Sequence, residues 1–421
     1  MSVSLSVIPG KIIRGLTRFF HSGGSALPGL VIEKIDPGFL ARTLNSLPYG
    51  VALISGTNGK TTTTKIVVEL LESQGLKVFT NRSGSNFTRG VISELIRDCN
   101  LLGQIDADIA VVELDEAYAV HFARAVPPRH TLLLNVLRDQ LDRFGEIDYT
   151  ASLLEKVAAA TTGKVVVNRE DPRLLAIAEQ LDENSVSYYG LSTELTKYFP
   201  NDEELHGKRI VVDQKPTASV LLDQLKGKTI TYKIARETIT NDLKLNGIYN
   251  TYNAVAAIAL CEAVLGDQLD IKKLDKRLAK IKPAFGRGEI VKIGKYPLEI
   301  VLVKNPSGFQ LGLDSYDNSG YEIMIAINDN YADGRDVSWL YDVDFSKLGK
   351  TIAYTSGARA YDMALRLDYA GVSVEKVEPD ISRCLAQILK KPAPRRIYCT
   401  YTAMLKIRHD LAKHVKILEA L

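Results

Sequence analysis

The stretch VALISGTNGKTTTTKIVVELLESQG, residues 51–75, decides the fold. It begins with an apolar run that is typical of a buried strand, and it ends in a segment that is typical of a helix. The loop between them contains two glycines, which let the backbone approach a ligand closely. Backbone N–H groups and the positive end of the helix would point at one spot. This arrangement predicts a phosphate-binding loop formed by Gly56, Thr57, Asn58, Gly59, Lys60, Thr61 and Thr62.

The loop departs from the standard phosphate-binding pattern GxxxxGK[ST]. The residue five positions before Gly59 is Ile54 instead of glycine. A plain strand-turn-helix with a surface lysine would be the simplest alternative, but GKT directly after a strand favours a nucleotide site. Lys60 is then expected to reach the outer phosphates, and Thr61 is expected to offer its hydroxyl to Mg²⁺.

A magnesium nucleotide also needs a carboxylate near the loop. The segment IAVVELDEA, residues 109–117, ends a predicted strand with three acidic residues. Glu113 and Asp115 share one face of an extended chain. Glu113 is the predicted metal ligand, because ligands of open α/β sheets bind at the carboxyl ends of strands. Glu116 is expected to lie in a solvated acidic turn.

Length and composition limit the class of protein. The chain has 421 residues, which suggests two or three domains, and a net charge of +3, which gives no reason to expect a nucleic-acid partner. Its four cysteines form no CxxC pair, so the spacing of a zinc ribbon is absent and no zinc is expected. So few cysteines in a chain of this size indicate a reduced, cytoplasmic protein.

The order of the predicted elements indicates an α/β fold. Strands and helices alternate from about residue 51 to 167, which predicts a central parallel sheet. Short strands separated by polar turns at about 190–241 predict a small antiparallel insertion. FGRGE, residues 285–289, is read as a hinge before a smaller C-terminal α/β domain. The predicted division is therefore 1–45, a helical segment; 46–285, a central domain; and 286–421, a C-terminal domain.

The N-terminal segment leaves two interpretations open. Lys11, Arg14 and Arg18 recur at helical spacing beside apolar residues. A helix packed on the body of the protein is the simpler interpretation. A basic, apolar helix that touches a membrane surface is the alternative, which would place the protein at the inner face of the membrane.

Several segments carry a resemblance to a known family. GTNGKTTT resembles the ATP loop of the Mur ligase superfamily, and VVELDEA, LNVLRDQLDRFGEID, VVNREDP and LNGIYNTYNAVAA follow in the same order as in that superfamily. NDNYADGRDVSW, residues 328–339, is longer and more specific. Together with TNRSGSNFTRG, LVKNPSGF and SGARAYDMALRLDYAG, it resembles the MurT family, the Mur-ligase-like subunits of lipid II isoglutaminyl synthase.

The resemblance implies a Mur-ligase-like fold and a reaction. ATP with Mg²⁺ would phosphorylate the α-carboxylate of D-glutamate in the stem peptide of lipid II. Ammonia from a GatD-type glutaminase subunit would then give D-isoglutamine, so the implied assembly is a heterodimer. The family pattern also implies that Asp336 orients the histidine of the glutaminase. The alternative is that Asp336 caps a helix or pairs with Arg335, and the sequence alone does not separate Asp336 from Asp333 or Asp342.

The resemblance extends to other site residues. Asn250 and Asn253 are expected near the nucleotide base, and Arg287 and Lys304 are expected at the cleft between the domains. Four residues of a polar loop are expected to hold substrate or merely to cap helices: Asn81, Ser83, Asn86 and Arg89.

Two other functions stay open at this point. One is a self-sufficient Mur-type ligase that joins an amino acid to a carboxylate. The other is a non-enzymatic module that binds a nucleotide and a partner. NDNYADGRDVSW, without an amino-acid-binding motif of the DNPR kind, favours the synthetase subunit over both.

Overall fold

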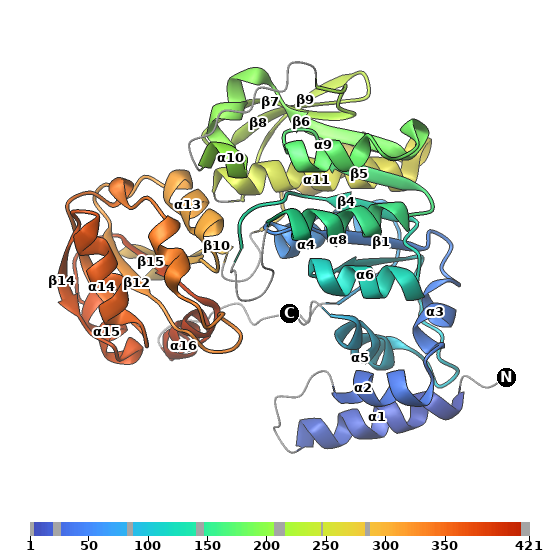
Figure 1. Cartoon of the computed structure of the whole chain (residues 1–421), viewed down its shortest axis with the longest axis horizontal. Coiled ribbons are helices and arrows are strands. Elements are labelled where there is room, and N and C mark those ends of the chain that lie inside the picture. Colours follow the sequence, from blue (N-terminus) through green and yellow to red (C-terminus); the bar gives the residue numbers. More distant parts are fainter. Residues whose placement is uncertain are drawn as a thin grey trace.

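The structure is a computed structural model with two sheets, each covered by helices on both faces (Figure 1). It describes residues 4–19, 27–81, 87–139, 147–205, 215–245, 247–282 and 287–413.

The larger sheet holds the quoted stretch at its centre. Its nine strands run in the order β2-β3-β1-β4-β5-β6-β7-β8-β9. Neighbours from β2 to β7 are parallel, so their carboxyl ends share one edge. The strands are β1 (Val51–Ser55), β2 (Val78–Thr80), β3 (Ile109–Glu113), β4 (His130–Leu133), β5 (Lys164–Asn168), β6 (Val186–Leu191), β7 (Val220–Lys226), β8 (Thr229–Ile234) and β9 (Glu237–Asp242).

The predicted antiparallel insertion is in part an extension of this sheet. The segment VSYYGL, residues 186–191, lies at the start of this insertion, which was expected to be antiparallel, but β6 pairs in parallel with β5. That expectation is wrong, because periodicity does not reveal which neighbour a short strand pairs with. Among the described strands of this sheet, only β7, β8 and β9 form an antiparallel meander, which extends the sheet at one edge. The segment RIVVDQ, residues 209–214, lies outside the described residues.

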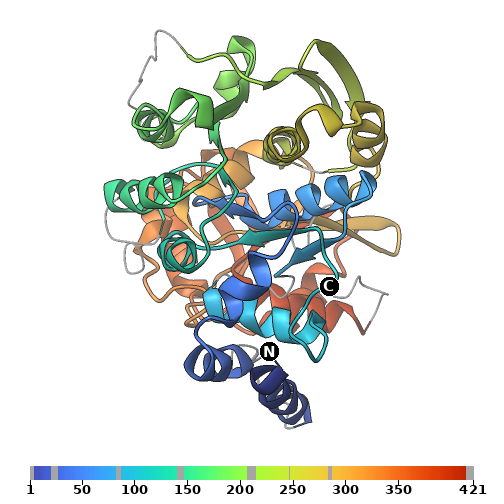
Figure 2. The same ribbon diagram turned by 90° about the vertical axis from the view of Figure 1, so that its right-hand side faces the viewer.

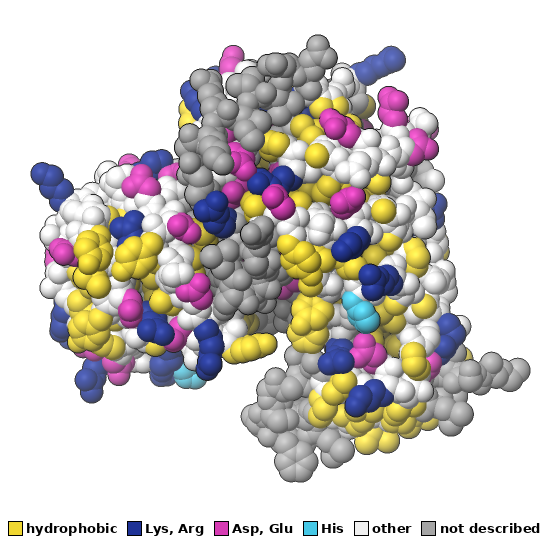
Figure 3. Space-filling model, viewed as in Figure 1, with side chains coloured by type: hydrophobic (Ala, Val, Ile, Leu, Met, Phe, Trp, Pro, Cys, Tyr) yellow, Lys and Arg dark blue, Asp and Glu magenta, His cyan; other side chains and the backbone are white. Residues whose placement is uncertain are grey.

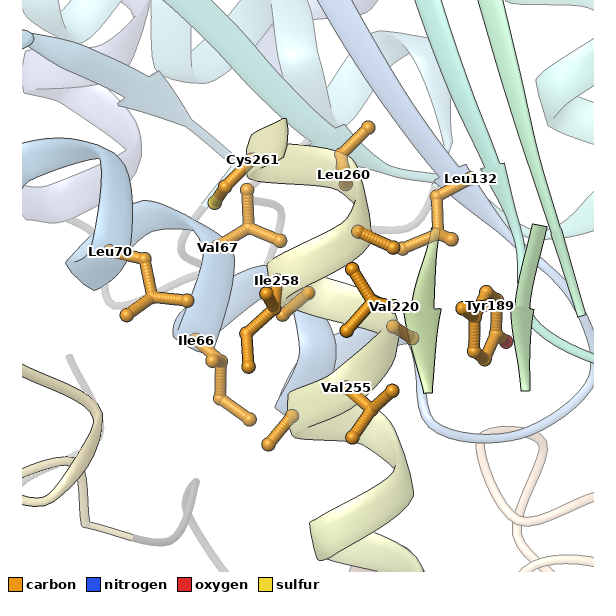
Figure 4. Close-up of a cluster of buried hydrophobic side chains, with 14 of the residues drawn as sticks. Ile66, Val67, Leu70, Leu132, Tyr189, Val220, Val255, Ile258, Leu260 and Cys261 are labelled. Carbon is orange, nitrogen blue, oxygen red and sulfur yellow. The ribbon is translucent and has the colours of Figure 1, made fainter. Parts of the chain in front are cut away.

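Helices bury one stripe each against the two faces of the sheet. On one face lie α4 (Lys60–Ser73), α11 (Ile248–Leu265) and α12 (Ile271–Leu278). Figure 4 shows Ile66 and Val67 of α4 meeting Ile258 and Cys261 of α11 in the core between these helices and the strands. The other face is covered by α3 (Phe39–Leu44), α5 (Thr88–Asp98), α6 (Glu116–Ala125), α8 (Ile147–Ala159) and α9 (Pro172–Ala178).

The longest helix of the described residues, α11, belongs to this core. The segment 248–268 is long and apolar enough to cross a membrane by length and composition alone. Its alanine-rich face is buried against α4 and the strands. Close packing against the sheet explains the apolar composition, because a helix that is hydrophobic on most sides is typical of a core position.

The N-terminal helices pack on α5. They are α1 (Ser4–Phe19) and α2 (Leu27–Ile35). Val7 is fully buried, and Gly10 lies close to the side chains of Ile32 and Ile96. Figures 1 and 2 both place this pair at the end of the molecule opposite β7, β8 and β9.

The C-terminal domain has a six-stranded sheet in the order β10-β11-β15-β12-β13-β14, parallel except for the β10–β11 hairpin. Helices α13 and α14 pack on one face, and α15 and α16 pack on the other. The elements are β10 (Arg287–Ile293), β11 (Tyr296–Leu302), α13 (Pro306–Ser315), β12 (Glu322–Ala326), β13 (Thr351–Ser356), α14 (Ala360–Tyr369), β14 (Ser373–Val377), α15 (Ile381–Ile388), β15 (Arg395–Cys399) and α16 (Tyr401–Leu411).

Candidate nucleotide site at the domain junction

The loop between β1 and α4 requires its two glycines. Gly56 and Gly59 have φ angles of 128° and 91°, a region that favours glycine. A Cβ on Gly56 would lie 2.9 Å from the carbonyl oxygen of Asn135, and one on Gly59 would lie 2.5 Å from Oδ1 of Asn253. The loop is therefore packed tightly between β4 and α11, and Asn253 lies beside it.

Lys60 begins α4 and is only 5% exposed. Its Nζ donates to the carbonyl oxygen of Gly56 at 2.6 Å and lies 3.0 Å from Oδ1 of Asp115. Burial alone lowers the pKa of Lys60, but the carboxylates of Glu116 and Asp115 outweigh it, so the pKa lies above its ordinary value. The lysine is charged at every physiological pH and is aimed into the loop.

Glu116 corrects one expectation. The residue was expected in a solvated turn, but it is buried at the start of α6, with its carboxylate 4.0 Å from the ammonium of Lys60. A helix N-terminus stabilises a negative charge, and Lys60 adds to that effect. Glu116 is therefore part of the buried charged cluster that it forms with Lys60 and Asp115.

Glu113 ends β3 directly beside the loop. Its side chain is 2% exposed, and the hydroxyl of Thr61 donates to Oε1 at 3.0 Å. Asn81 fixes the backbone there: its amide nitrogen donates to the carbonyl of Glu113 at 2.9 Å, and its oxygen accepts from the N–H of Glu113 at 3.0 Å. A carboxylate and a hydroxyl fit Mg²⁺, which takes one or two protein oxygens together with substrate phosphates.

A second loop supports the first from the side. Asn135 follows β4, and its amide exchanges hydrogen bonds with the backbone of Asn58 at 2.9 and 3.0 Å. The hydroxyl of Thr57 similarly bonds to the backbone of Leu137. Asn135 was not among the predicted site residues, although its position directly after a strand of the parallel sheet was a usable signal.

Two residues of the segment VVNREDP hold that second loop in position. Asn168 donates to the carbonyl of Leu134 at 3.0 Å, and Asp171 accepts from the N–H of Val136 at 2.6 Å. Asp171 also caps α9, and its burial raises its pKa to about 6. These residues act on the nucleotide loop through the backbone of residues 134–137.

The C-terminal domain reaches the nucleotide loop from the opposite side. Lys304 donates from Nζ to the carbonyl oxygen of Thr57 at 3.1 Å and lies 3.6 Å from a carboxylate oxygen of Asp139. Asn305, the N-cap of α13, exchanges hydrogen bonds with the side chain of Asn58 at 3.2 and 3.4 Å and donates to Asp139 at 3.1 Å. The two domains thus meet directly at the loop.

Of the remaining residues predicted to bind nucleotide or substrate, some lie near the loop, one pairs elsewhere, and others are outside the described residues. Asn250 lies in the first turn of α11 and accepts a hydrogen bond at 3.4 Å from the amide of Asn253, in the next turn. Arg287 starts β10, but its side chain is outside the described residues. Arg89 forms an ion pair with Glu33 of α2. Ser83 and Asn86 lie outside the described residues.

The structure distinguishes the three aspartates that the sequence left open. Asp333 is buried and accepts from the N–H of Thr402 at 2.7 Å, so it caps α16. Asp336 is half-exposed and accepts from the N–H and the hydroxyl of Ser338, both at 2.8 Å. Asp342 is exposed. Asp336 thus caps a short helical turn at the surface, which leaves its role toward a glutaminase as a prediction.

The loop after β12 is held rigidly. Asn328 donates to the hydroxyl of Thr402 at 3.0 Å and accepts from the N–H of Ala358 at 3.0 Å, and Asn330 donates to Thr402 at 2.8 Å. The loop is thereby tied to the starts of α16 and α14. Tyr331, in contrast, is 92% exposed.

No metal cluster stands out elsewhere. Within the described ranges, no three His, Cys, Asp or Glu side chains gather in a way that could hold a metal ion. All four cysteines are buried as thiols. Thr61 and Glu113 are therefore the candidate metal ligands of the described residues.

Two family comparisons agree with this architecture. The Mur ligase middle domain matches residues 54–261, which contain the nucleotide loop and Glu113. The MurT ligase C-terminal family matches residues 302–404, which contain Lys304 and Asp336. The fold, the loop and these two matches, which together span most of the chain, make the protein similar to the Mur ligases. Its C-terminal domain is similar, among these ligases, to the MurT type.

Curated relatives give the same assignment. The chain is 29% identical over 407 residues to the lipid II isoglutaminyl synthase (glutamine-hydrolyzing) subunit MurT of Staphylococcus aureus strain COL, covering 90% of this chain and 91% of that protein. It is also 29% identical to the MurT subunit of Streptococcus pneumoniae, covering 92% of each. A UDP-N-acetylmuramoylalanine–D-glutamate ligase of Agrobacterium fabrum matches only 56% of the chain, at 29% identity.

Solved structures support the fold. MurF from Acinetobacter baumannii has a TM-score of 0.68 at 16% identity and covers 92% of this chain and 81% of its own. A pseudomurein peptide ligase type C from Methanothermus fervidus has a TM-score of 0.67 at 19% identity, covering 86% and 78%. The predicted Mur-ligase-like α/β fold is confirmed.

Proposed function

We propose that this chain is the ATP-dependent synthetase subunit of a lipid II isoglutaminyl synthase. It phosphorylates the α-carboxylate of D-glutamate in the stem peptide of lipid II, and ammonia from a glutaminase subunit then displaces phosphate to give D-isoglutamine. The relatives with this name span almost the whole chain. The protein would work in the cytoplasm, at the inner face of the membrane where a lipid-linked substrate is accessible.

One observation carries this proposal: the carboxyl edge of the C-terminal sheet extends from the nucleotide loop to Asp336. Lys304 and Asn305 follow β11 and contact the nucleotide loop. The loop with Asp336 follows β12, two strands further along the same parallel edge. Strands lie about 4.8 Å apart, so the two loops begin only about 10 Å from each other along the edge. Ammonia released beside Asp336 would have a short path to an activated carboxylate.

The chemistry required of this chain is positioning and charge neutralisation. A carboxylate is a poor electrophile, and the phosphate from ATP supplies the leaving group. Lys60 is buried, charged and held by Asp115, so it can move from that carboxylate to a phosphate without entering water. Thr61 and Glu113 would hold Mg²⁺ against the outer phosphates. Asn253 lies beside the same loop, on the side expected for the base, and Asn250 is its hydrogen-bond partner.

A second surface supports a protein partner. Tyr361, Leu365 and Tyr369 are exposed at spacings of four residues along α14, and the ring of Tyr341 lies 6.5 Å from that of Tyr369. Figure 3 shows hydrophobic side chains gathered on this outer side of the C-terminal domain. Tyrosine is enriched in protein interfaces because it combines apolar area with a polar tip. The start of α14 is tied to the loop of Asp336 through Asn328, so the surface and the candidate residue are continuous.

The primary experiment measures ADP release with lipid II. Ammonium alone should support turnover by this chain, and glutamine should support it only when the glutaminase subunit is present. An amino acid that drives ADP release instead of ammonium would make the chain a self-sufficient ligase. The absence of turnover with every nitrogen donor would overturn the proposal.

The partner surface has its own test. Tyr361→Asp together with Tyr369→Asp should weaken binding of the glutaminase at least about tenfold, because charged groups would be buried in the contact. ADP release with ammonium should stay unchanged. Tyr149→Asp, at an exposed tyrosine of α8, is the matched control. Equal binding by all three proteins would place the partner on another surface.

A further inference from the structure

The N-terminal segment is unusual in its charge. Residues 1–45 contain five lysines and arginines and two aspartates and glutamates, which gives them a formal charge of +3. The whole chain also has a net charge of +3, so the rest of the chain is balanced. The excess positive charge of the protein is therefore concentrated in this segment.

Helix α1 has an apolar face that the body of the protein does not cover. Its inner face holds Val7, which is buried, and Gly10, which contacts α2 and α5. Ile8 and Ile12, one turn apart, are 47% and 58% exposed. An isoleucine pair at this spacing forms an outward stripe, because residues four apart share a face of a helix.

Helix α2 repeats the pattern. Leu27 and Ile35 are exposed, Val31 between them is half-buried, and the three stand four residues apart. Ile32 points inward and is fully buried. Because α1 and α2 pack side by side, the pair displays two outward apolar stripes at one end of the molecule (Figures 1 and 2). Figure 3 shows hydrophobic and basic side chains together at this end.

The acidic side chains near these two apolar stripes are neutralised by ion pairs. The two acidic residues of the segment are engaged, because Glu33 pairs with Arg89 and Asp36 pairs with Arg42. Lys34 is exposed in the last turn of α2. Apolar stripes with nearby basic residues match the headgroup region of an anionic bilayer, where apolar side chains enter the boundary and cations stay at the surface.

We propose that α1 and α2 form a docking surface for an anionic lipid bilayer and hold the enzyme at the membrane. The choice of a bilayer over a second protein rests in part on the proposed function, because a lipid-linked substrate lies in the membrane. The formal charge of +3 on residues 1–45, with Lys34 exposed beside Ile35, supports it independently. The surface lies on the N-terminal helices, which pack on the central domain, and it is apart from the tyrosine surface of α14, so membrane and glutaminase can bind together.

Sedimentation of the full chain with vesicles tests the inference. Phosphatidylglycerol vesicles should bind the protein, and phosphatidylcholine vesicles should bind it more weakly. Ile8→Asp with Ile12→Asp should reduce binding at least tenfold, and Lys34→Glu should reduce mainly the binding to phosphatidylglycerol. The matched control is Ile290→Asp with Leu405→Asp, at exposed apolar residues of the C-terminal domain.

Three outcomes would overturn the proposal. The wild-type chain would fail to bind phosphatidylglycerol vesicles, the variants would bind as the wild type does, or the variants would dissociate a dimer or a protein complex instead.

ADP release with a water-soluble stem peptide as substrate separates the two proposals. It should be the same in the Ile8→Asp, Ile12→Asp protein and in the wild type if only docking is lost. Its absence from the wild type would count against the proposed function and not against membrane binding.

Discussion

The carboxyl edges of the two sheets both consist of loops that follow parallel strands, but the two edges differ in how far their side chains are buried. The edge of the central sheet is closed: Lys60 and Glu113 are almost completely buried, Lys60 forms an ion pair with Asp115, and Glu113 accepts a hydrogen bond from Thr61. The edge of the C-terminal sheet is rigid but open. Two asparagines of its loop, Asn328 and Asn330, bond to residues at the starts of α16 and α14. Tyr331 and Asp336, in contrast, stand at the surface.

The difference indicates a division of labour. A buried lysine in a tight loop is suited to a small, highly charged ligand, because low polarity strengthens its electrostatic effect. A rigid, exposed edge with tyrosines is suited to a protein surface, because little ordering is needed on binding. Substitutions on each edge should therefore affect different reactions of the same complex.

The largest expected effect is that of Lys60→Ala. ADP release should fall about 10³-fold with ammonium and with glutamine alike, because one cation at a transferring phosphate contributes on this scale. Lys65→Ala, one turn further along α4, is the control, since Lys65 pairs with Glu69 outside the loop. A loss confined to glutamine would contradict the assignment of this edge to ATP.

Asp336→Asn should produce the opposite pattern. Glutamine-dependent turnover should fall on the order of 10²-fold, because an acid that orients a catalytic histidine contributes at least this much. Turnover with ammonium and the affinity for ATP should stay unchanged. Asp342→Asn, at an exposed aspartate close by in the chain, is the control. An equal loss with both nitrogen donors would mean that Asp336 only caps its helical turn.

The amino edge of the central sheet should contribute stability without activity. His130 starts β4, and burial, with Arg129 and Lys164 nearby, lowers its pKa to about 4. As the pH falls below about 6.5, the unfolded chain binds a proton that the folded chain does not, so stability decreases. The loss should be roughly 2 kcal/mol at pH 5.

Urea unfolding of His130→Gln and of the wild type at pH 7 and pH 5 measures this loss. The variant should lose less stability than the wild type on acidification. Asp171 has a raised pKa and acts in the opposite direction over about pH 4 to 6, but equally in both proteins, so the difference isolates His130. His409→Gln, at an exposed histidine, is the control. Parallel pH profiles would contradict the assignment.

The sequence was sufficient to predict the nucleotide loop at the edge of the central sheet, but not the residues that pack around it. A glycine loop between a strand and a helix predicts its own geometry, so Lys60 and Thr61 were found from local pattern alone. Glu116 was misjudged because burial is set by distant segments that fold over a turn. Asn135 and Asn305 were missed for the same reason, since their contacts with Asn58 join elements far apart in the chain. Asp333 and Asp336 could be distinguished only from the structure, because Asp333 caps α16, which is distant in the sequence.

Lys304 is where the two edges meet, and it should give the smallest effect. Its ammonium joins the C-terminal domain to the carbonyl of Thr57 and to Asp139, and it is partly exposed. Lys304→Ala should raise the KM for ATP about fivefold with little change in kcat, because a partly exposed contact contributes about 1 kcal/mol. Lys347→Ala, at a surface ion pair with Asp314, should leave the KM unchanged. A loss in kcat with unchanged KM would mean that domain closure limits the chemical step, and that the two edges act as one site.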